Sequence, residues 1–102
     1  MSHITIDINS NLASKLNLFI QSFGSKELMF EKFIEFHRNR LKREIAAMQI
    51  DLKAYEQKHG MSSKEFFEKF EGGELTDSTD FILWSGIYQM YEESKTKLDK
   101  LA

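Results

Sequence analysis

The longest uninterrupted helical pattern in this chain is residues 25–59, which read SKELMFEKFIEFHRNRLKREIAAMQIDLKAYEQKH. The stretch contains neither proline nor glycine, and Gly60 follows it as a stop signal. Its first part carries a wide apolar stripe, and its second part narrows to a heptad-like seam of Leu41, Ile45, Met48, Leu52 and Tyr55. A wide stripe is typical of a globular core, whereas a narrow seam is typical of coiled-coil packing against partner helices. The stretch therefore predicts one long helix whose role changes near His37.

The residues before this helix predict a strand and a short helix. Residues 3–8 alternate strictly between polar side chains and isoleucine, which is the pattern of a half-buried strand. No second strand pattern follows, so we expect this strand to pair with its own copy in a second chain. A helical pattern over residues 11–23 ends at Gly24, and Ser25 is placed to cap the long helix. The expected fold is mainly α, with one N-terminal β-strand that pairs across a homodimer.

Two further helices are predicted after Gly60. Residues 62–65 form a capping-box sequence, and the brief helix that follows ends at a pair of glycines. The last helix is expected at about residues 78–100, which completes a helical hairpin behind the long helix. We assign residues 1–45 to dimerisation and candidate DNA binding, and residues 46–102 to partner binding.

The composition of the 102 residues excludes several classes of function. Without cysteine there is no disulfide and no thiolate metal site, and the three histidines share no metal-ligand spacing. No apolar run approaches the roughly 20 residues that span a bilayer. Neither a nucleophile elbow nor a glycine-rich phosphate loop is present. We therefore expect a cytoplasmic protein that is not an enzyme, holds no metal or cofactor, and does not enter a membrane.

The front of the chain resembles the ribbon-helix-helix family of small dimeric repressors and antitoxins. The resemblance covers about residues 3–45 and rests on Ile4-Thr5-Ile6-Asp7-Ile8, Leu12, Lys15-Leu16 and Phe23-Gly24-Ser25-Lys26. It implies that the paired strands enter the major groove of operator DNA. In that arrangement the base-facing residues are His3, Thr5 and Asp7, and the phosphate is held by the amides of Ser25 and Lys26. Because an acidic Asp7 approaches a polyanion unfavourably, the alternative is a ribbon that only dimerises.

The back of the chain resembles small bacterial and archaeal proteins encoded beside TumE-type toxins, which are presumed antitoxins. The resemblance spans about residues 41–101 and rests on the run from Asp51 to Phe66, followed by Glu74-Leu75, Asp80-Phe81 and Trp84. It implies that this half holds a small toxin protein.

Charge and aromatic content also separate the two halves. Residues 1–59 hold nine Lys/Arg and seven Asp/Glu, a balance of +2, whereas residues 60–102 hold five and nine, a balance of −4. The acidic half is also rich in aromatic residues at helical spacing, and aromatic residues dominate interface energetics. The residues expected to bind a small basic toxin are Phe67, Phe70, Glu74, Asp77, Trp84 and Tyr88.

The sequence therefore favours an antitoxin-like protein that dimerises, neutralises a toxin by occlusion and represses its own operon. One alternative is a helical scaffolding or oligomerisation protein without DNA binding, built on the seam of the long helix. A plain ribbon-helix-helix transcription regulator is the other alternative.

Overall fold

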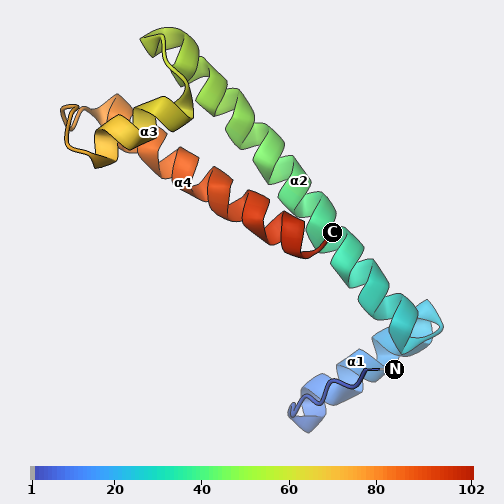
Figure 1. Ribbon diagram of the computed structural model, residues 1–102. Helices are drawn as coiled ribbons and strands as arrows, with labels where there is room; N and C mark the ends of the chain where they lie inside the picture. Colours follow the sequence, from blue (N-terminus) through green and yellow to red (C-terminus); the bar gives the residue numbers. More distant parts are fainter. Residues whose placement is uncertain (1) are drawn as a thin grey trace. The chain divides into compact units, whose positions relative to one another are not determined.

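The computed structural model describes residues 2–102 and is helical throughout its regular parts (Figure 1). Its elements, in chain order, are α1 (Ser10–Phe23), α2 (Lys26–His59), α3 (Ser63–Glu71) and α4 (Thr79–Lys100). The chain divides into two compact units, of which unit 1 ends at Phe36 and unit 2 is His37–Ala102. Helix α2 belongs to both units, so the division falls inside one continuous helix, close to the change of apolar pattern and nine residues before the expected boundary at residue 45.

The predicted N-terminal strand is wrong. Residues 2–9 carry no regular secondary structure, and no strand is assigned anywhere in residues 2–102. A strand exists through ladder hydrogen bonds to a neighbour, and the alternation of residues 3–8 supplies side-chain spacing but no neighbour. Ile4 and Ile6 are 86% and 66% exposed, so the alternation does not separate a buried face from a solvent face.

The predicted helices are confirmed, and their ends lie where short-range signals place them. Helix α1 begins behind Asn9, whose side chain accepts a hydrogen bond from the Leu12 amide at 2.8 Å. It ends at Gly24, whose φ of 99° lies in the left-handed region that glycine adopts without a Cβ penalty. The Ser25 hydroxyl then accepts from the Leu28 amide at 3.1 Å, which caps α2 as expected.

Helices α3 and α4 are capped in the same way. The Ser62 hydroxyl accepts from the Glu65 amide, and the Ser78 hydroxyl accepts from the Phe81 amide. A second acceptor serves α3, because the Glu56 carboxylate of α2 takes the Ser63 amide at 2.9 Å. This bond ties the start of α3 to α2 within unit 2 and satisfies an amide that the helix itself leaves unpaired.

Unit 2 closes a core around its single tryptophan. The Trp84 ring is fully buried and stacks on Phe66 with ring centroids 3.8 Å apart. The rings of Tyr55 and His59 also stack on it. The indole Nε1 donates a hydrogen bond of 2.9 Å to the buried Ser63 hydroxyl, so the polar atom of this large side chain is satisfied. The apolar side chains around this centre are Leu52, Met61, Phe67, Phe70, Leu75, Phe81, Ile87, Tyr88 and Tyr91.

Unit 1 is a helix pair with a thin contact. The rings of Phe19 and Phe23 meet Phe33 edge-on, with ring centroids 6.3 and 6.1 Å apart. Met29 is the one buried hydrophobic residue that the described part of unit 1 contains. The unit therefore has aromatic contacts between its helices but no enclosed core of its own.

Candidate interaction surfaces

The apolar side chains of unit 1 form its most conspicuous surface. Two short helices and an extended segment cannot enclose this many large side chains. Those that stay exposed within residues 2–36 are Ile4, Ile6, Ile8, Leu12, Leu18, Phe19, Leu28, Phe30, Phe33, Ile34 and Phe36. Single exposed apolar residues are normal, but this many large ones in one short unit indicate a candidate interaction site. A shallow groove of about 420 Å³ on α1, between Lys15, Leu18, Phe19 and Ser22, is part of this surface.

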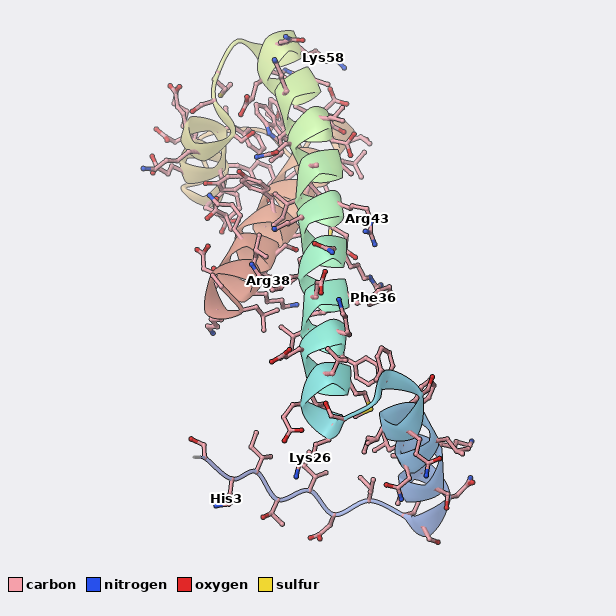
Figure 2. All side chains as sticks on the ribbon, turned by 90° about the vertical axis from the view of Figure 1, so that its right-hand side faces the viewer. His3, Lys26, Phe36, Arg38, Arg43 and Lys58 are labelled. Carbon is pink, nitrogen blue, oxygen red and sulfur yellow. The ribbon has the colours of Figure 1, made fainter. Side chains whose placement is uncertain are left out.

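The structure brings together only part of the residues expected to contact DNA. His3 and Lys26 line one groove of about 300 Å³, together with Ile4 and Phe30 (Figure 2). Thr5 and Asp7 are exposed on the preceding segment and do not line that groove. Because residues 2–9 form no strand, they present no ribbon for a major groove, and the base-reading roles of His3, Thr5 and Asp7 lose their structural basis.

The phosphate-holding residues lie at the start of α2. Ser25 is half-buried and uses its hydroxyl to cap the helix, while Lys26 is exposed as the first helical residue. Glu27 follows immediately in the first turn. The first turn therefore already carries a carboxylate, which counteracts the attraction of the helix N-terminus for phosphate.

The aromatic residues expected to bind a partner belong to the core of unit 2. Trp84 is fully buried, so its ring faces other side chains of the chain itself. Phe67 contacts Tyr88 at a centroid distance of 5.0 Å, and Phe70 stacks on Phe66 at 5.5 Å. Burial raises the pKa of the Tyr88 hydroxyl, and the nearby Glu92 carboxylate raises it further. Phe67, Phe70 and Tyr88 are half-buried, so they pack against the core and stay partly exposed.

The acidic residues of the same prediction are on the outside. Glu74 and Asp77 are exposed in the segment between α3 and α4. Residues 60–80 contain six carboxylates and two lysines, and one of those lysines, Lys69, pairs with Glu65 at 3.3 Å. Asp80 belongs to α4 and binds Lys58, and Lys64 is exposed near the start of α3. The four remaining carboxylates are exposed on α3 and the loop after it, namely Glu68, Glu71, Glu74 and Asp77. We call these four residues the acidic surface.

A polar clasp joins the last turn of α2 to the first turn of α4. The Asp80 carboxylate accepts from Lys58 Nζ at 2.6 Å and lies 3.1 Å from Nε2 of His59. The hydrogen bond from Lys58, followed by that from His59, lowers the pKa of Asp80, and the same Asp80 bond raises the pKa of Lys58. The clasp is a structural contact within unit 2, on the side of the Trp84 cluster where His59 stacks.

Sequence reasoning missed the exposed half of unit 1 and a second apolar stripe on α4. Leu28 and Phe30 belong to the wide apolar stripe that predicts a globular core, yet they are 40% and 48% exposed. Phe36, which lies outside that stripe, is 65% exposed. The available signal was their spread around α2, because apolar residues that face several directions cannot all meet one short neighbouring helix. On α4 the same signal is the exposed pair Ile82 and Leu83 directly before the buried Trp84.

No group of three or more His, Asp and Glu side chains within residues 2–102 is placed to hold a metal ion. None of the helices described here is both long and apolar enough to cross a membrane. Comparisons with protein-family models, with curated proteins and with solved structures find no match to this chain.

Proposed function

We propose that this chain is an antitoxin-like binding protein that works by occlusion, without catalysis. Two copies associate through the apolar surface of unit 1, and the acidic surface of unit 2 holds a small basic protein. The observation that carries the proposal is the contrast between the units: unit 2 encloses most of its large apolar side chains, whereas unit 1 leaves most of its own exposed. A chain that encloses only one of two hydrophobic clusters needs another molecule for the second.

Size supports self-association through unit 1. Segments of fewer than about 40 residues rarely enclose a stable core without an added constraint or a partner chain. Burying the exposed apolar side chains of unit 1 removes on the order of 900 Å² per chain from water, at about 150 Å² for a large side chain. Standard protein interfaces bury about 800 Å² per partner. The partner chain in this proposal is a second copy, packed helix against helix through Phe19, Phe33 and their exposed neighbours.

Charge supports a basic partner for unit 2. The four members of the acidic surface lie on α3 and the loop behind it, and none of them pairs with a lysine or arginine in the described chain. An acidic surface raises the rate of encounter with a basic protein and disfavours nucleic acid at the same place. A toxin that acts on RNA must carry such a basic surface. The resemblance of residues 41–101 to presumed antitoxins supports this choice of partner.

The scaffolding alternative receives less support. It requires the seam of α2 to face other molecules, whereas Leu41, Ile45 and Leu52 are buried in a single chain. Leu52 packs in one cluster with Phe66 and Trp84. The seam is therefore occupied by the chain's own helices. Operator binding through a strand ribbon is not part of the proposal, because residues 2–9 form no strand.

The test is co-expression of the full chain with the small protein encoded beside it. We expect the chain to restore growth and to co-purify with that protein. Reversing two charges of the acidic surface, in a Glu74→Lys/Asp77→Lys variant, should slow association at least tenfold at low salt. The matched control is Asp51→Lys/Asp99→Lys, which makes the same net-charge change at exposed positions outside the acidic surface. Equal association of both variants, or a neighbour that neither inhibits growth nor binds, contradicts the proposal.

A further inference from the structure

Helix α4 is apolar on two opposite sides, and unit 2 covers only one of them. The covered side carries Trp84 and Tyr88. The opposite side carries Ile82, Leu83 and Met90, which are 55%, 52% and 52% exposed. A surface helix of a globular protein usually carries one apolar stripe, which faces its own core. We call Ile82, Leu83, Gly86 and Met90 the outer face of α4.

Gly86 lies at the centre of this outer face. It is four residues after Ile82 and four before Met90, so the three share one side of the helix. Glycine inside a helix destabilises it relative to alanine. No contact within the chain requires a glycine here, because a Cβ at Gly86 would meet no atom within 4 Å. A glycine flanked by large apolar side chains and facing open space fits the close approach of a helix from outside.

We propose that the outer face of α4 docks on the same face of a second copy of this chain, with the two α4 helices antiparallel and crossing at Gly86. In this register Ile82 of one copy packs against Met90 of the other. Beside the outer face a groove of about 500 Å³ between α2 and α4 receives the flanking side chains, and Ala47 and Met48 line it on the α2 side. The missing side chain at Gly86 lets the two backbones approach where they cross.

The charges along α4 select the antiparallel orientation. The first turn of α4 carries Asp80, and its last turn carries Lys97 and Lys100. Antiparallel pairing therefore sets the acidic end of each copy against Lys97 of the other. A parallel pair would instead oppose Lys97 to Lys97 and Glu93 to Glu93.

The size of the outer face predicts the strength of the contact. Three half-exposed side chains and a glycine form less surface than the apolar group of unit 1. Interfaces below about 1,000 Å² in total are typical of weak, concentration-dependent association. The α4 contact is therefore a second, weaker interface between copies. It involves no residue of unit 1 and stands whether or not unit 1 associates.

The first test separates folding from docking. The background is the full chain with Phe33→Lys, which weakens the unit 1 contact about a hundredfold. The rise of mass with concentration in sedimentation then reports mainly the α4 contact. Adding Gly86→Leu should weaken this association at least tenfold. The melting temperature should stay equal or rise, because the new side chain enters open space and favours the helix. Unchanged association in the Gly86→Leu chain, or a mass that never rises in the background chain, overturns the proposal.

The second test uses the absence of cysteine from the sequence. Oxidation of the Gly86→Cys chain should give a cross-linked dimer in at least tenfold higher yield than the Ala54→Cys chain, whose substitution lies at an exposed position of α2. Orientation follows from mixing Ile82→Cys with Met90→Cys chains. Antiparallel pairing gives mainly mixed dimers, whereas dominant Ile82–Ile82 and Met90–Met90 links contradict it. Equal yields for the Gly86→Cys and Ala54→Cys chains also contradict the contact.

Discussion

The two units of this chain differ in how far they bury their large apolar side chains. Unit 2 holds five of the six buried hydrophobic residues among residues 2–102, and unit 1 holds eleven of the fifteen large ones that are exposed. Both are built from helices with regular caps. The difference is the number of helices available: α3 and α4 enclose Trp84 against α2, whereas α1 is the only helix that unit 1 can place against the start of α2. Helix formation alone does not produce a core. A unit that has too few helices needs another molecule to bury its apolar side chains.

The largest expected effect is the loss of the unit 2 core on Trp84→Ala. The fully buried indole leaves a large cavity, and truncating a buried Trp costs about 3–5 kcal/mol of unfolding free energy. Urea unfolding followed by circular dichroism measures this. The control is Ile50→Ala, at a 72% exposed apolar position, which should stay within about 0.5 kcal/mol of the unchanged chain. Similar losses for both variants would mean that Trp84 is not the centre of a closed core.

The next effect is on self-association of unit 1. Phe33→Lys places a charge where the aromatic contacts with Phe19 and Phe23 lie and where the second copy packs. We expect a loss of affinity of about a hundredfold, or roughly 2.7 kcal/mol, in sedimentation equilibrium. Unit 2 should keep its unfolding free energy. Glu31→Lys adds the same side chain at an exposed position of α2 and is the control. A Phe33→Lys chain of unchanged mass would refute the role of this surface.

A smaller effect tests the one buried hydrogen bond of unit 2's aromatic centre. Ser63→Ala removes the acceptor of the Trp84 indole N–H and leaves this donor buried without a partner. The expected cost is about 1–3 kcal/mol, measured by the same urea unfolding. Ser62→Ala, which removes only the cap of α3, should cost about 1 kcal/mol. An equal or smaller loss for Ser63→Ala would show that water replaces the hydroxyl.

The smallest effect is a pH dependence that belongs to unit 2 alone. Because Lys58 and His59 lower the pKa of Asp80, the clasp stabilises the fold above the ordinary aspartate pKa of 3.8. That contribution is lost as the pH falls through the lowered value. The melting temperatures of the unchanged chain and of Asp80→Asn are compared from pH 5 to pH 2. Below about pH 4 the melting temperature of the unchanged chain should fall more steeply than that of Asp80→Asn. Parallel curves would exclude the clasp as a source of acid sensitivity.

Local signals predicted the helices of this chain, and contacts between elements decided the rest. The helix ends at Asn9, Gly24 and Ser62 depend on hydrogen bonds or backbone angles within a few residues. They can therefore be predicted from the sequence. Residues 3–8 misled, because their alternation shows spacing, and a strand also needs a neighbour. The roles of the aromatic residues after Met61 were out of reach for a related reason. Spacing places Trp84 on one side of a helix but does not tell which element covers that side.

The candidate interaction surfaces were only partly readable from the sequence. Glu74 and Asp77 are polar loop residues, and their exposure was predictable. The open apolar group of unit 1 was not, because spacing cannot show that α1 is too small to cover Phe30 and Phe36. The outer face of α4 was also not predictable, because the spacing of apolar residues does not distinguish its exposed residues from their buried neighbours.

The most direct test of the contrast between the units is hydrogen exchange of the full chain at two protein concentrations, with the mass measured in the same samples. At the concentration where the chain is monomeric, we expect the amides of α1 to exchange freely and those of Phe66 and Phe70 in α3 to stay protected. At the higher concentration the α1 amides should become protected as the mass doubles, while the α3 amides keep their protection. Equal protection of α1 in the monomer and in the dimer would contradict the account, because unit 1 would then hold its fold without a second copy.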